Sequence, residues 1–500
     1  MPVTPSRTVV IGAGPAGLTA AYLSARRGWP VVVLEADERY VGGLSRTVEH
    51  QGYRFDIGGH RFFSKSEAIE KLWTEILPDD MLVRPRSSSI YYRGRFFSYP
   101  LRAMEALVRL GPVEAARCMA SYASARLFPV REPRSFEDWV TNQFGRRLYA
   151  IFFKTYTEKV WGTDCREISA DWAAQRIKNL SLGAAVRNAL LPQSRRSGKQ
   201  IKSLIESFRY PRLGPGMLWE ECARKTQQLG GRLCMGRRVV GLAFDEPSRT
   251  WRVRHEGAAG DVAELTAENV ISSAPLREVA LSLSPALGEE ARRAAAGLRY
   301  RDFLTVMLIL PDRGAVKDNW IYVHDPDVKV GRIQNFKSWS PDMVPDPTMA
   351  SYGLEYFCFE GDGLWSSPDA ALLDLAQREL QAVGLSSAGE VRDGCVVRMR
   401  KAYPVYDEGY QQRCQAIRDE LESRFPTLHL VGRNGMHKYD NQDHAMTTSL
   451  LTIENIAAGG RPYDVWRVNQ DAEYVEEDDS PAAPSRACEP SRSPDRSSRE

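Results

Sequence analysis

The chain has 500 residues, long enough for two or three domains or one large compound domain. It is 43% hydrophobic and 26% charged, which is ordinary for a globular protein. Its net charge of only +3 argues against a nucleic-acid-binding protein. Eight scattered cysteines without a CxxC pair, and an N-terminus that leads directly into a strand, favour a cytoplasmic protein without a signal peptide. Apolar runs such as FLTVMLIL at 303–310 are too short to span a membrane, so we expect no integral membrane segment.

Residues 8–37 are predicted to form a β-α-β unit that binds a dinucleotide. A buried strand, TVVI, leads into GAGPAG, which opens a helix, and VVVLEA follows as the second strand. Gly12, Gly14 and Gly17 form a GxGxxG pattern whose glycines allow the tight turn and a close approach to a pyrophosphate at the helix N-terminus. Glu35 ends the second strand at the distance expected for a carboxylate that binds the adenosine ribose.

The loop after the second strand favours FAD over NAD(P). Gly42 and Gly43 lie in RYVGGLSRT, which resembles the glycine-bearing segment of flavoproteins of the amine oxidase and protoporphyrinogen oxidase type. A second GxGxxG is absent from the sequence, so no separate NAD(P) domain is expected. The resemblance implies that later strands complete the FAD site, with contacts from Val239, Gly432 and Arg433.

Beyond the β-α-β unit, the hydrophobic pattern changes between helical and strand periodicity along the chain. Helical periodicity predominates at about 65–200, strands and helices mix at 215–300, and strands predominate from 303 to 406 around one helix at 369–384. We predict an α/β fold with a discontinuous Rossmann-like FAD-binding domain, a helical insertion and a mainly antiparallel sheet domain. The predicted boundaries are FAD-binding parts at 1–64, 208–300 and 425–470, a helical substrate-side domain at 65–207, an antiparallel-sheet substrate domain at 301–424, and a disordered tail at 471–500.

A histidine follows two glycines in GGHRFF at 58–63. Gly58 and Gly59 allow unusual backbone angles or a close approach to a partner. Considered alone, His60 is more often a packed structural histidine than a functional one.

Several segments together resemble the UDP-galactopyranose mutase family, and they occur in that family's order. The last of them is the most specific, because it combines a glycine-arginine strand end with a tyrosine and an Asn-Gln-Asp-His run. The segments are GGHRFFS (58–64), KVWGTDCREISADWAAQRI (159–177), FRYPRLGPGMLWE (208–220), NWIYVHDPDVKVGRIQNFKSWSP (319–341), KAYPVY (401–406) and GRNGMHKYDNQDHAM (432–446).

The resemblance implies an enzyme that interconverts pyranose and furanose forms of a nucleotide-activated hexose without net redox change. Reduced FAD would attack the anomeric carbon through N5, so NAD(P)H or another reductant must first reduce it. His60 would lie against the flavin ring, while Arg176 and Arg332 would bind the departing diphosphate. Considered alone, these arginines read as a charge on a helix surface and a strand-edge ion pair.

Further site residues follow from the same resemblance. Tyr322, Tyr403 and Tyr439 match family tyrosines near the phosphates, and Trp172 would pack under the base, although each alone is more often a core or rim residue. Asn441 and Gln442 are assigned to the cofactor. Asp443 is equally well explained as the N-cap of the next helix.

Two other functions remain open at this stage. An FAD-dependent oxidoreductase or desaturase of the amine oxidase class would share the fold, and so would a flavin-bearing scaffold without catalysis. The seven histidines show no metal-binding spacing, so no metal is expected. The expected partner is a nucleotide sugar, and the sequence is compatible with a homo-oligomer.

Overall fold

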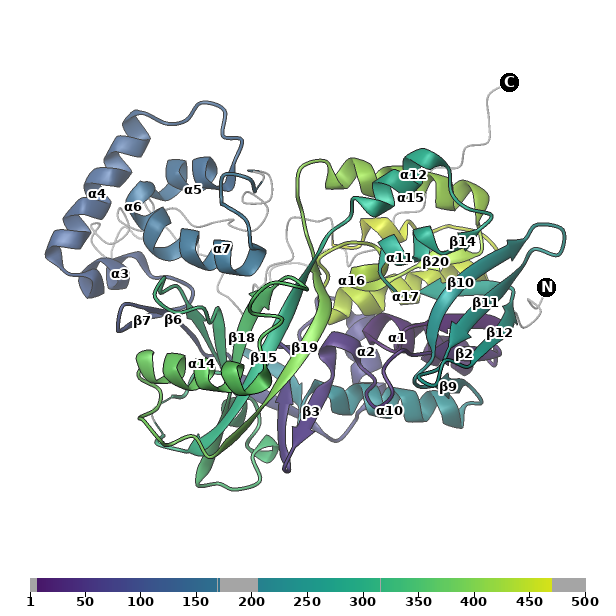
Figure 1. The fold of residues 1–500 in the computed structure, drawn as a ribbon, viewed down its shortest axis with the longest axis horizontal. Helices are drawn as coiled ribbons and strands as arrows, with labels where there is room; N and C mark the ends of the chain where they lie inside the picture. The colour runs from purple at the N-terminus through teal and green to yellow at the C-terminus, as the bar shows by residue number, and fades with distance from the viewer. Residues whose placement is uncertain (1–6, 169, 171–205, 315, 470–500) are drawn as a thin grey trace.

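The computed structural model describes residues 7–168, 170, 206–314 and 316–469 (Figure 1). The tail predicted to be disordered, 471–500, lies outside the described residues. Within the described part, no helix has the length and apolar character needed to cross a membrane.

A five-stranded sheet is assembled from three distant parts of the chain (Figure 1). Its order is β20-β13-β1-β2-β9, and every neighbouring pair is parallel. The strands are β1 (Thr8–Ile11), β2 (Val31–Leu34), β9 (Arg232–Cys234), β13 (Asn269–Ser272) and β20 (Leu428–Leu430). This sheet confirms the predicted α/β class and the β-α-β unit at 8–37.

The two faces of this sheet are covered by different layers. On one face, Val10 packs among helices α1 (Pro15–Arg26), α2 (Glu67–Ile76), α10 (Pro215–Gln228) and α17 (Gln442–Ala457). On the other, Val9 and Ile11 pack against a four-stranded sheet and against helices α11 (Leu276–Leu281), α12 (Glu289–Ala296) and α15 (Tyr410–Arg424). Because successive strand residues point to opposite faces, burial on both sides explains the continuous apolar run.

The four-stranded sheet has the order β12-β11-β10-β14. Its strands are β10 (Arg238–Asp245), β11 (Thr250–Glu256), β12 (Val262–Ala267) and β14 (Leu283–Ser284). The N-terminal end of β10 reaches the nucleotide side of the molecule, where Val239 lines a cavity described below.

A seven-stranded sheet forms the second large layer, in the order β19-β15-β18-β17-β16-β6-β7. Leu304, Val306 and Leu308 pack toward helix α14 (Asp369–Ala382). Phe303 and Met307 point to the opposite face and pack in a second hydrophobic cluster. The strands are β6 (Ser88–Tyr92), β7 (Arg95–Ser98), β15 (Tyr300–Pro311), β16 (Trp320–Val323), β17 (Arg332–Asn335), β18 (Met349–Cys358) and β19 (Asp393–Pro404).

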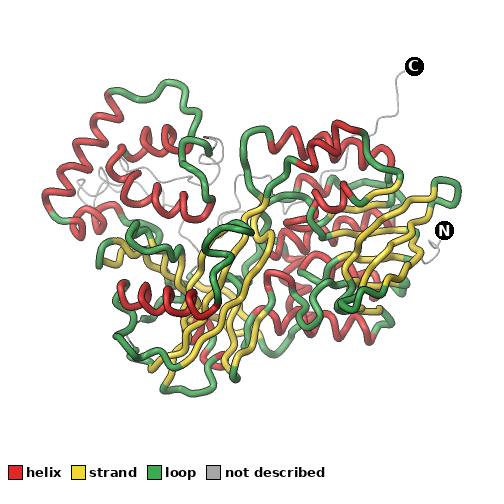
Figure 2. Tube along the Cα trace, in the orientation of Figure 1, coloured by secondary structure: helices red, strands yellow, loops and turns green. Residues whose placement is uncertain are grey.

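A lobe of helices projects beside β6 and β7 (Figure 2). Its elements are α3 (Ala103–Leu110), α4 (Pro112–Leu127), α5 (Phe136–Phe144), α6 (Arg146–Tyr149), a π-helix (Ala150–Lys154) and α7 (Thr155–Trp161). Its core packs against Ile90 and Phe97 of the two neighbouring strands. This lobe is called the helical lobe below.

The expectation that helices predominate from about 65 to 200 holds at α2 but is wrong at residues 81–98. The structure places three strands there, β5 (Met81–Pro85), β6 and β7, and β6 pairs with β16 in the large sheet. Arg93 and Gly94 both take positive φ angles, which makes the tight turn of the β6–β7 hairpin.

Shorter elements link these layers. Strand β3 (Thr47–His50) pairs with β4 (Tyr53–Asp56), and β5 pairs with β8 (Ser207–Pro211). The remaining short helices are α13 (Phe336–Trp339) and α16 (Gly432–Gly435), with 3-10 turns at Gly43–Ser45, Pro341–Met343 and Val465–Arg467.

Candidate active site

A cavity of about 1850 Å³ is lined by residues of the parallel sheet, the large antiparallel sheet and the helical lobe. Gly17 and Gly42 do not line it, and Trp172 and Arg176 lie outside the described residues. The residues predicted from the sequence that line it are Gly12, Gly14, Glu35, Gly43, Gly59, His60, Val239, Tyr322, Arg332, Tyr403, Gly432, Arg433, Tyr439, Asn441 and Gln442.

The glycines of the first βα turn bring backbone segments into close contact. Gly12 has φ of +94°, and a Cβ on Gly17 would lie 1.8 Å from the carbonyl oxygen of Gly12. A Cβ on Gly43 would lie 3.2 Å from the Cα of Gly14, so the two glycine-bearing loops meet at the cavity wall. Gly42 supports this junction, because its N–H donates to the carbonyl of Ala13 over 2.8 Å.

The carboxylate of Glu35 lies at the end of β2 and faces the same junction. It accepts hydrogen bonds from the N–H groups of Ala13 at 2.6 Å and Asp37 at 2.8 Å. Burial raises the pKa of Glu35 above its usual value. The two N–H groups fix the carboxylate at the position where a ribose of a dinucleotide would approach the start of α1.

His60 lies deep in the cavity, with both ring nitrogens hydrogen-bonded. Its Nε2 is 2.8 Å from the carbonyl oxygen of Leu44 and 3.1 Å from that of Ile57, so Nε2 carries the hydrogen. Its Nδ1 lies 3.4 Å from Ser45 Oγ and accepts from that hydroxyl. Burial, together with the charge of Arg433, lowers the pKa of His60 to about 4. The imidazole is therefore neutral at pH 7.

Gly59 makes room for an aromatic ring. A Cβ there would lie 2.1 Å from Cζ3 of Trp320, so only glycine lets this ring of β16 lie against the backbone. The guanidinium of Arg61 lies 5.5 Å from the same ring, on which it stacks, and donates to Ser88 Oγ over 2.9 Å. One tryptophan thus joins the GGHR segment to the large sheet.

Arg332 occupies an interior strand and is held by a buried carboxylate. Its Nε donates to Glu355 of β18, which also accepts from Gln334 Nε2 at 2.6 Å. Its Nη2 donates to the hydroxyl oxygen of Tyr403 at 3.0 Å. Because the pair is interior to the sheet, it differs from the strand-edge ion pair considered above.

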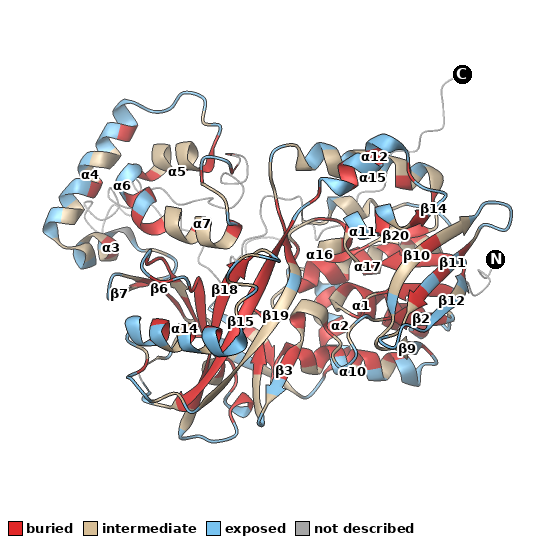
Figure 3. Ribbon diagram, viewed as in Figure 1, coloured by how far each residue is buried: buried red, intermediate tan, exposed pale blue. Residues whose placement is uncertain are grey.

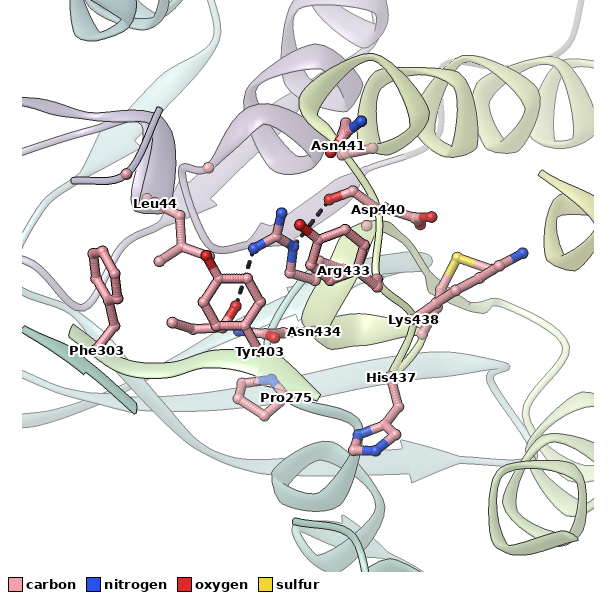
Figure 4. Close-up of a pocket in the computed structure, with 18 of the residues that line it drawn as sticks. Leu44, Pro275, Phe303, Tyr403, Arg433, Asn434, His437, Lys438, Asp440 and Asn441 are labelled. Atoms are coloured by element: carbon pink, nitrogen blue, oxygen red, sulfur yellow. Dashed lines mark hydrogen bonds between the residues drawn. The ribbon is translucent and has the colours of Figure 1, made fainter. Parts of the chain in front are cut away.

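Tyr403 and Tyr439 stack on one another beside a second arginine, Arg433, which Figure 4 shows next to Tyr403. Their ring centroids are 5.7 Å apart at an angle of 13°. Arg433 lies 5.2 Å from the Tyr403 ring and 4.9 Å from the Tyr439 ring. It is oriented by the carbonyl oxygens of Asp440 and Ala402, which accept from its Nε and Nη1 at 2.9 and 3.1 Å.

The start of α17 corrects one expectation. The N-cap is Asn441 rather than Asp443, because the helix begins at Gln442. Asn441 N–H donates to His444 Nδ1 at 3.2 Å, and Asp443 accepts instead from Ser64 Oγ at 3.2 Å. Gln442 donates to the Arg61 carbonyl at 3.3 Å, while its buried Oε1 has no hydrogen-bond partner among the residues that the structure describes. That atom is a free acceptor beside the cavity.

Several cavity residues were missed by sequence reasoning. Tyr156 of α7 stacks on His324 at 4.9 Å and meets Tyr322 edge-on at 5.4 Å. Trp320 also lines the cavity, and Glu355, which does not line it, acts through Arg332; both sit among strand residues whose burial looks purely structural in the sequence. A signal was available for two of them, since Trp320 lies within the resemblance at 319–341 and Tyr156 lies in KTYTEKVW, next to the resemblance at 159–177.

The residues present fit FAD. The Gly12 turn and Gly43 provide a cradle without side chains, Glu35 provides an acceptor for ribose hydroxyls, and Gln442 Oε1 provides an acceptor for a ring N–H. Among the described residues, no cluster of three His, Cys, Asp or Glu side chains could hold a metal ion.

Comparison with known proteins agrees with this fit. The model of the flavin containing amine oxidoreductase family matches residues 15–440. The dTDP-fucopyranose mutase of Escherichia coli is 26% identical over 175 residues, which cover 33% of this chain and 44% of its own length. The L-amino-acid oxidase of Crotalus adamanteus is 43% identical over 67 residues, which cover 13% of each chain.

A solved structure resembles the chain over nearly its whole length. The structure of reduced UDP-galactopyranose mutase has a TM-score of 0.77 at 22% identity and covers 92% of this chain and 95% of that chain, a likeness of fold. The chain spans less than half the length of the curated relatives it matches. Since the family model covers most of the sequence, the chain belongs to the flavin containing amine oxidoreductase family, and its cofactor is FAD.

Proposed function

We propose that this flavoenzyme interconverts pyranose and furanose forms of a nucleotide-activated hexose. The observation that carries the proposal is that two arginines and four tyrosines, side chains that can bind phosphate, line one cavity: Arg332, Arg433, Tyr156, Tyr322, Tyr403 and Tyr439. Reduced FAD, when bound, supplies the nucleophile for the anomeric carbon, so the protein needs no nucleophilic side chain. The mutases among the similar proteins support this choice.

Arg332 and Tyr403 would bind the leaving diphosphate. Tyr403 accepts from Arg332 Nη2, which leaves the phenolic hydrogen free to donate to a phosphate oxygen. Burial raises the pKa of Tyr403, so the phenol keeps its proton at neutral pH. The guanidinium next to it would stabilise the charge that develops as the C–O bond breaks. Arg176 would add a second cation.

Arg433, which lies beside the stacked rings of Tyr403 and Tyr439, would assist. Its Nε and Nη1 are bound to carbonyl oxygens, so its position is fixed before any ligand arrives. A fixed guanidinium stabilises negative charge without first having to reorganise.

His60 would position the flavin and would not transfer protons. Its Nε2–H is directed to two carbonyls and its Nδ1 to Ser45, so neither nitrogen faces the substrate. Its pKa of about 4 keeps it uncharged at neutral pH. A neutral ring can pack against a flavin without adding charge beside it.

A second candidate function is an amine oxidase-type oxidoreductase, and one observation favours it. The charge of Arg332 is balanced by Glu355, and the guanidinium is enclosed by Trp320 and Phe357 at 4.8 Å each. This part of the cavity is therefore less cationic than the count of arginines suggests, which suits a small apolar or zwitterionic substrate.

Anaerobic incubation with a panel of UDP- and dTDP-sugars tests the proposal. FAD-loaded protein is used oxidised and after reduction with dithionite, and products are separated by chromatography. We expect an isomer of unchanged mass, formed only by the reduced enzyme and without consumption of reductant. If no sugar is isomerised but a small amine or amino acid reduces the oxidised flavin, the oxidoreductase is the correct function.

Two further measurements complete the test. Tyr403→Phe should slow isomerisation, whereas Tyr352→Phe, a buried tyrosine of β18 outside the cavity, should not. Reduction of bound FAD by NADH or NADPH, followed by loss of its absorbance near the visible maximum, identifies the reductant. A flavin that can be neither reduced nor reoxidised would point to a non-catalytic scaffold.

A further inference from the structure

The outer side of the helical lobe carries exposed apolar side chains that no described element covers. Val108 is 75% exposed, Val113 66%, Leu127 74% and Phe128 81%. Figure 3 colours much of the outer side of α4 as exposed. We call this surface the α3–α4 face and define it by Met104, Val108, Val113, Leu127, Phe128 and Val130.

The apolar residues of α4 share one side of that helix. Val113 and Leu127 are separated by almost four helical turns and point within about 40° of one another. The residues between them on that side of α4, Ala116, Ala120 and Ala123, are also exposed. In sequence, Val108 lies near the end of α3, just before α4, and Phe128 directly follows the last residue of α4. Exposed apolar patches of this kind mark interaction sites.

Basic side chains surround the face. Residues 102–134 hold six arginines and three glutamates, so this short segment alone has a net charge of +3, equal to that of the whole chain. Arg102, Arg126 and Arg131 are exposed beside the apolar residues. An apolar surface bordered by arginines complements an interface in which anionic headgroups lie over acyl chains.

We propose that the α3–α4 face docks peripherally on an anionic phospholipid bilayer. A second copy of this chain fits less well, because a two-fold contact of the face with itself would bring arginines against arginines. The lobe projects from the body of the molecule, so a flat surface can reach it (Figure 1). Tyr99, Leu101 and Phe153, which belong to the same region, line the cavity. Docking of the α3–α4 face would therefore set the orientation of the cavity relative to the bilayer. The proposal stands independently of the reaction catalysed.

Vesicle cosedimentation of the full-length, FAD-loaded protein tests this. The protein is mixed with phosphatidylcholine vesicles or with vesicles that contain a quarter phosphatidylglycerol, at low and at high salt. We expect binding to the anionic vesicles and its loss at high salt. Arg126→Glu/Arg131→Glu should lower the partition coefficient at least about tenfold, since each arginine near such a surface contributes about fivefold. Leu127→Ser/Phe128→Ser should lower it at least about tenfold as well.

Matched variants on other surfaces serve as controls. Val262→Ser on β12 removes another exposed apolar side chain, and Arg292→Glu/Arg293→Glu changes charge on α12. Both should bind vesicles like the wild type, and all variants should keep the absorbance spectrum of bound FAD. Equal binding to neutral and anionic vesicles, wild-type binding by the face variants, or a dimer that only Leu127→Ser/Phe128→Ser dissociates would overturn the proposal.

Discussion

The dinucleotide end of the cavity and its substrate end are built in different ways. At the dinucleotide end, Gly12, Gly17 and Glu35 lie within one β-α-β unit and meet through backbone contacts. At the substrate end, Arg332 depends on Glu355 and Tyr403, which come from two other strands of a sheet. The first end is a local motif and the second is a long-range assembly. They should therefore respond differently to substitution.

The largest expected effect is at the substrate end. Arg332→Met leaves Glu355 buried without its cation, which should lower the free energy of unfolding by about 3–5 kcal/mol. The double variant Arg332→Met/Glu355→Leu should recover most of that loss while activity stays absent. Chemical denaturation measures both. If the single variant is as stable as the wild type, the ion pair does not hold this end together.

The next largest effect is expected at the dinucleotide end, where a substitution of Gly17 should weaken FAD binding. Gly17→Ala places a methyl group on the Gly12 carbonyl, and such overpacking should cost about 3 kcal/mol. Displacement of the turn should lower FAD affinity roughly a hundredfold, measured by titration of the apoprotein. Gly363→Ala, where a Cβ has no neighbour within 4 Å, is the control and should bind FAD normally. Unchanged affinity in Gly17→Ala would show that the turn can move without consequence.

Removal of one hydroxyl should affect chemistry more than stability. Tyr403→Phe removes the acceptor of Arg332 Nη2 and the proposed phosphate donor, so kcat should fall about tenfold or more. The thermal midpoint should change little. The effect is measured as kcat at a saturating substrate concentration. A kcat equal to that of the wild type would show that Tyr403 takes no part in the reaction.

Low pH should reduce the stability of the folded protein through protonation of His60. Its folded pKa of about 4 lies below the value of about 6.5 expected in the unfolded chain. Between these values only the unfolded chain binds the proton, so His60 destabilises the fold as pH falls from about 6.5 to about 4 and has no such effect above that range. The thermal midpoint of the wild type should therefore fall more steeply over this range than that of His60→Asn. Parallel curves would contradict a neutral His60.

The smallest effect is expected at Ser45. Its hydroxyl donates to His60 Nδ1 over a long 3.4 Å contact, and Ser45→Ala should cost only about 0.5–1 kcal/mol. FAD affinity should fall less than about fivefold, measured by the same titration as for Gly17→Ala. A larger loss would show that the tautomer of His60 depends on this hydroxyl.

The same contrast explains what sequence reasoning can reach. The spacing of Gly12, Gly17 and Glu35 predicts their arrangement because every contact is set within thirty residues. The burial of β15 on both faces follows from its apolar run. Both predictions use information that is local in the chain.

Other features depend on partners far along the chain. The β6–β7 hairpin was expected to be helical, and it becomes part of a sheet by pairing with β16, more than two hundred residues later. Trp320 against Gly59 and Glu355 against Arg332 are likewise pairings that no spacing rule indicates. The N-cap at Asn441 was missed because Asn and Asp are nearly equal as caps.

The order of strands in the parallel sheet has a consequence for synthesis of the protein. Its outermost strand, β20, is made about 420 residues after β1, and β13 between them lies more than half-way along the chain. At about 5–20 residues per second, a ribosome needs roughly 20–80 s to produce the last strand after the first has emerged. The nascent β-α-β unit therefore gains β13 part-way through synthesis, and that side of the sheet is completed by β20 only after this interval. We therefore expect FAD to be captured only at the end of translation, by a nearly complete chain.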